Sequence, residues 1–289
     1  MIQKLLEMAF LEDLGDIGDI TSDAIFTDNK LDNYYLVAKQ DGVLCGADIF
    51  ACAFHYIDKE CKVEFSLSNK EKSFLDGDLL KCGQQIAKVQ GSINTILKAE
   101  RVAINFISHL SGIATEVRKW VDLLSLIPNN NTKILDTRKT LPGWRQLQKY
   151  AVKCGGGTNH RMGLYDMVMI KDNHIDSIGS ITKAVEIIRS KWGERFKIEV
   201  ETRTLKEVQE ALTNNVDIIM VDNMDIDTMK EAVKLINIKT GGKIKTEASG
   251  NMNLERVKAV AETGVDYISV GSLTHSVIAF DFSLRKILV

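Results

Sequence analysis

The sequence has little net charge and no long hydrophobic run, and each absence excludes a class of protein. A formal net charge of −2 over 289 residues argues against a general nucleic-acid or membrane-surface binder. No apolar run approaches the roughly 20 residues that span a bilayer. The opening residues, MIQKLLEMAFLEDLG, carry acids where a signal peptide has small residues and a cleavage site.

The five cysteines form no CxxC pair, and their number is odd. We therefore expect free thiols in a reducing compartment, with neither a disulfide framework nor a zinc site. Together these absences predict a cytoplasmic protein without a nucleic-acid or membrane partner. A hydrophobic content of 45% and a charged content of 26% are ordinary for a globular protein with a substantial core.

The first 110 or so residues mix helical and strand patterns without a repeating order. Residues 2–14 have helical spacing, two strands are expected around a turn at residues 41–42, and residues 61–68 alternate like a further strand. A long helical stretch follows over residues 93–126, with an interruption expected at residues 111–112. These patterns predict a small α+β domain.

From residue 133 onward, short apolar runs alternate with amphipathic segments. The runs are KILD, MVMI, KIEVE, VDIIMVD, IKTEAS and DYISVG, and segments such as SITKAVEIIRSKWG lie between them. Strands alternating with helices predict a parallel sheet with crossover helices. Six or seven such units fit a β/α barrel or a doubly wound sheet. Because no GxGxxG follows a strand, a dinucleotide-binding fold is disfavoured.

Ionisable residues, hydroxyls or glycine follow each run, as in ILDTRK, VMIKDNH, IEVETR, IMVDNM, TEASGN and ISVGSLTH. In a barrel the C-terminal strand ends converge on one face, where catalytic groups lie. One polar residue at a strand end could simply face solvent, but six strands with the same habit favour a site. We therefore predict that Lys171 closes its strand because the strand delivers it to that site.

Cations concentrate between Thr137 and His174, where seven Lys/Arg residues accompany only two acids. Lys149 and Lys153 are on a helical segment and are expected to form a solvated face. Others lie at strand ends or near the glycines of GGGTNHRMG, where the backbone can approach a ligand closely. This concentration predicts a substrate that carries several carboxylates or phosphates.

Two acids, Glu201 and Asp222, end neighbouring runs and should reach the same face as Lys171. Glu199 shares a side of its strand with Glu201, because side chains alternate with a period of two. Carboxylates among cations suit a hydrated magnesium ion, ribose hydroxyls or both, although they could instead only neutralise nearby cations.

The last two strands are followed by hydroxyl, glycine and imidazole groups: Ser249, Gly250, Gly271 and His275. Loops at this position in a barrel, leading into a helix, commonly hold a monophosphate. The residues therefore predict one site for a phosphate, a sugar with magnesium, and a second polyanionic substrate.

At these residues the sequence resembles the quinolinate phosphoribosyltransferases, also called nicotinate-nucleotide pyrophosphorylases (carboxylating). The matching text includes EDLGDIGDITS, ERVAINFISHLSGIAT, DTRKTLPGWRQLQKYAVKCGGGTNHRMGLYDMVMIKDNHI and TGVDYISVGSLTHS. The resemblance spans nearly the whole chain and implies an α/β fold with two domains. These are an N-terminal α+β sandwich, residues 1–111, and an incomplete, about seven-stranded parallel β/α barrel, residues 112–275. Residues 276–289 are expected to pack back on the first domain.

The resemblance also implies an activity in de novo NAD biosynthesis. The phosphoribosyl group of phosphoribosyl pyrophosphate (PRPP) would pass to quinolinate with Mg²⁺, giving nicotinate mononucleotide, pyrophosphate and CO₂. The family implies a homodimer or a larger homo-oligomer, in which Arg101 would reach the site of the partner subunit.

By the same resemblance, four residues would surround quinolinate: Arg138, His160, Arg161 and Lys171. Four would hold the 5′-phosphate: Ser249, Gly250, Gly271 and His275. Lys139 would contact pyrophosphate or the pyridine carboxylate, while Glu201 and Asp222 would hold the ribose hydroxyls and, through water, the magnesium ion. The catalytic group would be Lys139, Lys171, Glu201 and Asp222.

Two positions depart from the family pattern. Trp144 stands where leucine is more frequent, and Asn251 stands where a second glycine follows Gly250. Within the same fold, the alternatives are a relative associated with molybdenum transport and nicotinate phosphoribosyltransferase. The others are a phosphoribosyltransferase of the Rossmann-like type, whose glycines should follow its acids within a few residues, and a non-catalytic phosphosugar sensor. The cluster of cations that could face a second anion disfavours the sensor.

Overall fold

The computed structural model describes residues 2–28, 30–66 and 73–286. The chain forms two compact units, one of residues 1–116 with 277–289 and one of residues 117–276. Helix α4 (Ile93–Ser125) contributes residues to both. Among the described residues, no helix combines the length and apolar character needed to cross a membrane.

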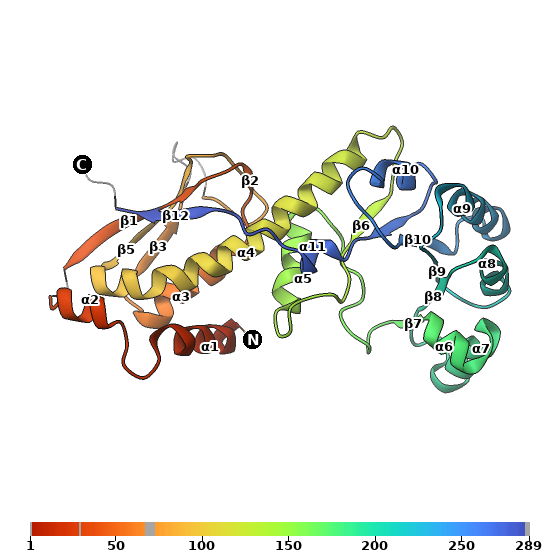
Figure 1. The fold of residues 1–289 in the computed structure, drawn as a ribbon, viewed down its shortest axis with the longest axis horizontal. Helices are drawn as coiled ribbons and strands as arrows, with labels where there is room; N and C mark the ends of the chain where they lie inside the picture. Colours follow the sequence, from red (N-terminus) through yellow and green to blue (C-terminus); the bar gives the residue numbers. More distant parts are fainter. Residues whose placement is uncertain (1, 29, 67–72, 287–289) are drawn as a thin grey trace. The chain divides into compact units, whose positions relative to one another are not determined.

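The first unit contains an antiparallel sheet with strand order β12-β1-β5-β3. Its strands are β1 (Leu31–Ala38), β3 (Lys62–Phe65), β5 (Gln85–Ser92) and β12 (Phe282–Arg285). Figure 1 shows β12, near the end of the chain, beside β1. A second, two-stranded pairing joins β2 (Gly42–Val43) to β4 (Leu79–Leu80).

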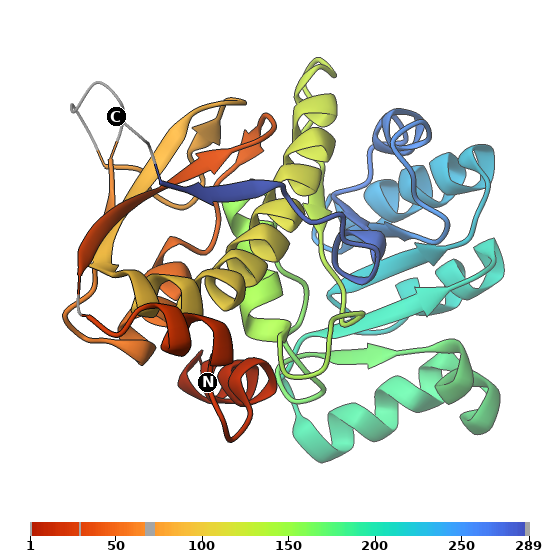
Figure 2. The ribbon, with the colours of Figure 1, turned by 60° about the vertical axis from the view of Figure 1, so that its left-hand side comes forward.

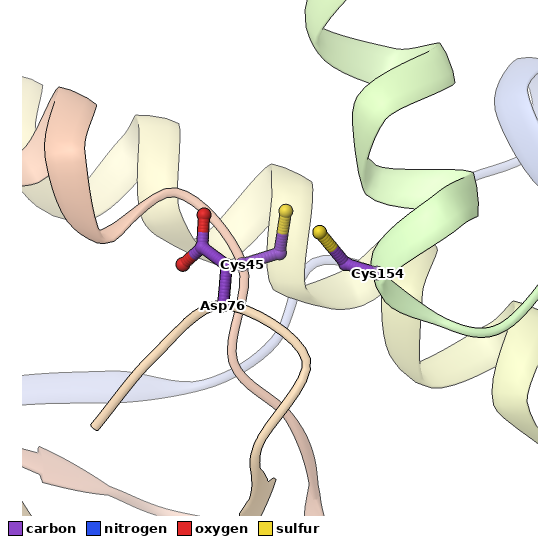
Figure 3. Close-up of side chains that lie close together, drawn as sticks. All are labelled: Cys45, Asp76 and Cys154. Atoms are coloured by element: carbon purple, nitrogen blue, oxygen red, sulfur yellow. The ribbon is translucent and has the colours of Figure 1, made fainter.

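Helices α1 (Ile2–Leu14), α2 (Ile20–Ile25) and α3 (Ala47–Ile57) complete this unit with the first part of α4. Helix α3 buries one apolar face that includes Phe50 and Phe54, and the Phe50 ring lies 5.8 Å from that of Phe65 on β3. Figure 3 shows Asp76 beside Cys45, just before α3 begins. Because Asp76 accepts the N–H groups of residues 46 and 47, a carboxylate from another loop caps α3. Cys154, also labelled there, ends α5 in the other unit.

Two expectations for this unit are wrong in detail. The strands around residues 41–42 form, but they do not pair with each other, because β1 pairs with β5 and β12 while β2 pairs with β4. The predicted interruption of the long helix is absent from the described chain, where α4 is continuous. The strand predicted over residues 61–68 ends at Phe65, and positions 67 and 68 lie outside the described residues.

The small residues within α4 permit close contact instead of breaking the helix. The Ser111 hydroxyl donates to the Cys45 carbonyl at 3.0 Å and accepts the Cys45 N–H at 2.9 Å. A methyl group added to Gly112 would lie 2.2 Å from the carbonyl oxygen of Ile278. Glycine is therefore needed at residue 112 for space, and its cost in helix propensity is small by comparison.

The second unit is built on a parallel sheet with strand order β6-β11-β10-β9-β8-β7. The strands are β6 (Lys133–Leu135), β7 (Val168–Ile170), β8 (Ile198–Thr202), β9 (Ile218–Asp222), β10 (Lys245–Ser249) and β11 (Tyr267–Ser269). All six predicted runs are strands, and all pair in parallel, so the predicted alternation is confirmed. In place of a seventh strand, the described residues show an isolated parallel bridge between Leu135 and Thr158.

Helices separate these strands: α5 (Arg145–Cys154), α6 (Asp172–Ile178), α7 (Ile181–Trp192), α8 (Leu205–Leu212), α9 (Ile226–Thr240), α10 (Val257–Ala261) and α11 (Ser272–His275). Figure 2 shows α7, α8 and α9 along one side of the strands. Each begins at a residue whose side chain accepts a backbone N–H, namely Ser180, Thr204 and Asp225. The crossover helices thus start where the sequence supplies N-caps.

Candidate active site at the C-terminal strand ends

A pocket of about 780 Å³ opens at the C-terminal ends of the parallel strands, entirely within the second unit. Every strand of the sheet contributes to its lining, from residues 137–139 after β6 to Gly271 after β11. The volume is in the range of small-molecule sites. The converging strand ends predicted from sequence are therefore a real feature of the fold.

Eleven of the twelve predicted site residues line this pocket: Arg138, Lys139, His160, Arg161, Lys171, Glu201, Asp222, Ser249, Gly250, Gly271 and His275. Arg101 does not, because it lies exposed on α4 in the other unit. The lining also includes Met169, Met220, Glu247 and Ser269, which the sequence did not single out. Each of these four lies two residues before a strand-end group that was predicted, as the period of two requires.

Lys171 and Glu201 face each other at the rim of the pocket. The Lys171 ammonium lies 3.7 Å from Glu201 Oε2, and the lysine side chain is 45% exposed while the glutamate is 13% exposed. Burial raises the pKa of Glu201, as does the charge of Asp222, while Lys171 opposes both. The Lys171 N–H donates to His174 Nδ1 at 2.9 Å, so the histidine that follows caps α6 and is not in the pocket lining.

Arg138 and Arg161 place two guanidinium groups in the same pocket. Arg161 is 9% exposed and donates to the Met167 carbonyl at 3.0 Å. Burial lowers the pKa of Arg161, and the neighbouring charge of Arg138 lowers it further. Arg138 Nε is buried without a hydrogen-bond partner among the described residues. Two close cations with an unused buried donor are suited to an anion that carries more than one charge.

His160 rests on two fully buried carboxylates, Glu199 and Glu247, that the sequence did not mark as its partners. Its Nε2 lies 3.0 Å from Glu199 Oε2 and 3.5 Å from Glu247 Oε2. Burial lowers the pKa of His160, but the two carboxylates outweigh this and raise it. Burial and the charge of Glu247 raise the pKa of Glu199 to about 7.

The hydrogen bonds of His160 identify its tautomer. Nδ1 accepts the Arg161 N–H at 2.7 Å, so the proton on the neutral ring lies on Nε2, toward the carboxylates. The Arg161 N–H thus occupies Nδ1 and the two carboxylates face Nε2, so both ring nitrogens face protein groups.

The prediction that Lys149 lies on a solvated face is wrong. Its side chain is fully buried and pairs with Asp136, which is also fully buried. Lys153, in the next turn of α5, is exposed as expected. Arg145 also lies outside the pocket lining and donates to the carbonyl of Met162 at 3.3 Å. Of the seven cations between residues 137 and 174, four therefore line the pocket.

The loop after β10 explains the departure at Asn251. Gly250 has φ +95°, and an added methyl group would lie 2.1 Å from Asn223 Oδ1, so only glycine fits. Asn251 has φ 47° and Asn223 has φ 54°, in the left-handed region that asparagine tolerates better than most residues. The Asn223 amide donates to Asp222 Oδ2 at 2.7 Å and its Oδ1 accepts the Asn251 amide at 3.4 Å, which connects the acid to this loop. Trp144, the other departure, precedes α5, and its backbone N–H donates to the Leu141 carbonyl at 3.1 Å.

Comparison with known proteins gives concordant matches for both parts of the chain. The family model for the C-terminal domain of quinolinate phosphoribosyl transferase matches residues 113–285, and the N-terminal domain model matches residues 19–111. A probable nicotinate-nucleotide pyrophosphorylase [carboxylating] of Bacillus subtilis (strain 168) is 45% identical over 283 residues, covering 98% of this chain and 92% of that protein. Quinolinate phosphoribosyltransferase [decarboxylating] 1b of Nicotiana tabacum is 41% identical over 98% of this chain and 82% of its own length.

Solved structures of similar fold include proteins of the same name. The nicotinate-nucleotide pyrophosphorylase from Francisella tularensis has a TM-score of 0.89 and 37% identity, covering 98% of this chain and 95% of its own. Human nicotinic acid phosphoribosyltransferase, at 11% identity and a TM-score of 0.54, shares the fold alone. Matching models over both halves and high identity over nearly the full length lead to one conclusion: the chain belongs to the quinolinate phosphoribosyltransferase family.

Proposed function

We propose that the protein transfers the phosphoribosyl group of PRPP to quinolinate, with decarboxylation, as a step of NAD biosynthesis. The observation that carries this proposal is the pairing of Arg138 and Arg161 in a pocket that also holds two acids and a glycine-containing loop. A simple phosphosugar sensor has no use for the paired guanidinium groups. The names of the relatives described above agree with this activity.

Quinolinate would bind through its adjacent carboxylates to Arg138 and Arg161, with Lys171 supplying a third positive charge. Arg138 Nε, which has no described partner, is available for one of these carboxylates. His160 would contact the ring through its carbon edge, because both of its nitrogens face protein groups. In this arrangement His160 still lies beside quinolinate, as the family resemblance implies.

PRPP would lie along the opposite wall. Glu201 and Asp222 would accept hydrogen bonds from the ribose hydroxyls, and the 5′-phosphate would rest on the loops that contain Ser249, Gly250 and Gly271. A methyl group on Gly271 would lie 2.9 Å from Lys139 Cδ, so this glycine lets Lys139 cross beside the loop. Lys139 would thereby reach the pyrophosphate, and His275 would complete the phosphate site.

We further propose that Mg²⁺ is required, held through water by Glu201 and Asp222. The donor set fits, because carboxylate oxygens suit this hard cation and the negative charge of Asp222 raises the pKa of Glu201, a repulsion that a bound cation would relieve. Bound there, the ion would offset the negative charge that develops on the departing pyrophosphate. The remaining chemistry falls to the side chains of this chain.

The bond from the ribosyl C1 to the pyrophosphate oxygen breaks as the bond from C1 to the quinolinate nitrogen forms. Lys139 would stabilise the charge on the leaving group, while the guanidinium pair orients the nucleophile. The resulting ring nitrogen is positive, so the electron pair from the adjacent carboxylate can be retained by the ring as CO₂ leaves. A proton from solvent then replaces the lost carboxylate, and the products are nicotinate mononucleotide, pyrophosphate and CO₂.

Two further proposals concern the setting of the enzyme. We propose a homodimer or a larger homo-oligomer, in which the exposed Arg101 on α4 is contributed to the site of the partner subunit. The support is the family resemblance together with the exposure of Arg101. We also propose a cytoplasmic location, which agrees with an odd number of cysteines and no CxxC pair in the sequence.

Direct assay tests the proposed activity. Purified protein with PRPP, Mg²⁺ and quinolinate should form nicotinate mononucleotide, and nicotinate should be a poor substitute because it lacks the second carboxylate. Product formation from nicotinate at an equal or higher rate would identify a nicotinate phosphoribosyltransferase. Binding of PRPP without any transfer to either acid would indicate a sensor.

A further inference from the structure

A buried ion pair, Asp136 with Lys149, lies next to the pocket without lining it. Asp136 follows β6, Lys149 lies on α5, and both are fully buried. Neither belongs to the set of residues that line the pocket. Removing two charges from water is costly, so a pair in this position needs compensating contacts.

The compensating contacts converge on one residue, His160. Asp136 Oδ1 accepts the His160 N–H at 2.8 Å, and the Lys149 ammonium donates to the His160 carbonyl at 3.1 Å. The pair therefore holds both peptide groups that flank the His160 α-carbon. Asn159 strengthens the arrangement, because its amide donates to Asp136 Oδ2 at 2.5 Å and to the Lys149 carbonyl at 2.8 Å.

The next residue transmits this hold to the anion pocket. The Arg161 N–H donates to the His160 ring, and the Arg161 guanidinium donates to the Met167 carbonyl. The backbone position of Arg161 thus depends on His160, whose own backbone depends on the ion pair. A shift of about 1 Å in a substrate-orienting group can cost a hundredfold in rate.

We propose that Asp136 and Lys149 are positioning residues, which fix the turn at Asn159–Arg161 so that the Arg161 guanidinium points at the anionic substrate. This proposal rests on the proposed function for the identity of that substrate. The ion pair holds the turn through hydrogen bonds to the His160 backbone and contacts no substrate itself. Its loss therefore weakens the use of quinolinate and leaves the PRPP side of the pocket intact.

The test separates positioning from simple stabilisation. Lys149→Met alone leaves Asp136 as an uncompensated buried charge and is expected to destabilise the fold. The double variant Asp136→Asn/Lys149→Met removes both charges, keeps an oxygen that can accept the His160 N–H, and loses the donor to the His160 carbonyl. We expect this double variant to fold and to melt cooperatively.

For the double variant we expect the quinolinate KM to rise at least fivefold while the PRPP KM changes less than twofold. Hydrogen–deuterium exchange of the substrate-free protein should show faster exchange for the backbone amides of residues 158–162. Lys245→Met is the matched control, because it breaks the more exposed Lys245–Asp266 ion pair of the same unit, outside the pocket lining. It should change neither measurement.

An unchanged quinolinate KM and unchanged exchange at residues 158–162 in the folded double variant would overturn the proposal, as would equal increases in both KM values. Exchange is measured without substrate, so it tests the hold on the backbone of residues 158–162 separately from quinolinate binding. If the wild-type protein transfers nothing to quinolinate, the proposed function fails. Faster exchange in the double variant would still show that Asp136 and Lys149 hold the turn at Asn159–Arg161.

Discussion

Replacing Arg161 by alanine should weaken quinolinate binding far more than PRPP binding. The side chain is 9% exposed, and one arm of its guanidinium already donates to the Met167 carbonyl at 3.0 Å. Its second terminal nitrogen donates to Met169 Sδ at 3.6 Å, and Arg161, Met169 and Arg138 all line the pocket. Removing Arg161 therefore deletes a charge-assisted contact to a substrate carboxylate without emptying the pocket of cations.

The magnitude follows from the type of contact. A hydrogen bond to a charged group contributes about 1.5–3 kcal/mol, which corresponds to a factor of roughly 10 to 150 in the dissociation constant. The alanine variant also leaves the Met167 carbonyl without its donor, at a cost in stability of about 1–3 kcal/mol. Arg161→Lys keeps the charge but cannot serve both the Met167 carbonyl and a carboxylate, so its quinolinate affinity should be intermediate.

Calorimetric titration with quinolinate and, separately, with PRPP and Mg²⁺ would measure both effects. Arg203→Ala is a suitable control, because Arg203 also follows a strand but pairs with Asp176 and Glu207 outside the pocket lining. The control should bind quinolinate normally. Wild-type quinolinate affinity in folded Arg161→Ala protein would refute the assignment of the guanidinium pair.

Three further outcomes are expected. Gly250→Ala should impair PRPP binding severely, because the new methyl group would meet Asn223 Oδ1 at 2.1 Å. The control Gly264→Ala is also at positive φ, but its nearest neighbour is 3.7 Å away, so it should cost stability only. Equal PRPP affinities of the two variants would refute this prediction. The free energy of unfolding should fall as pH rises from about 4.5 to about 7, because the raised pKa of Glu199 makes the folded state hold the carboxyl proton more tightly than the unfolded state does. Urea titrations at pH 5 and pH 8 should show a smaller fall for Glu199→Gln than for the wild-type protein. An identical fall in the two proteins would contradict this prediction. Lys171→Arg should lose most activity while the fold survives, and borohydride should not trap Lys171 with substrate, since neither substrate offers a ketone.

The strands of the second unit could be predicted because each is a short apolar run that ends in polar residues. In a parallel sheet, that pattern also fixes which ends meet, so the gathering of Lys171, Glu201 and Asp222 followed from the sequence. The pairing of strands in the first unit did not, because β1 pairs with β12 more than 240 positions later in the chain, and no local pattern records such a partner.

The partners of buried polar side chains were the part of the structure that the sequence predicted least well. Lys149 follows the helical period of a solvated residue, and only the fold places Asp136 beneath it. Glu247 lies inside a strand two positions before Ser249, so its inward direction was predictable, whereas its partnership with His160 was not. The continuity of α4 through Gly112 was likewise invisible, since it depends on close contact with Ile278.

The proposed reaction predicts that the carboxylate next to the ring nitrogen is lost. Quinolinate labelled with ¹⁴C in that carboxylate should release labelled CO₂ only when PRPP and Mg²⁺ are both present, in a one-to-one ratio with pyrophosphate. Quinolinate labelled in the other carboxylate should leave its label in nicotinate mononucleotide. Absence of labelled CO₂ from wild-type protein with all components present, or release that does not depend on PRPP, would contradict the proposed activity.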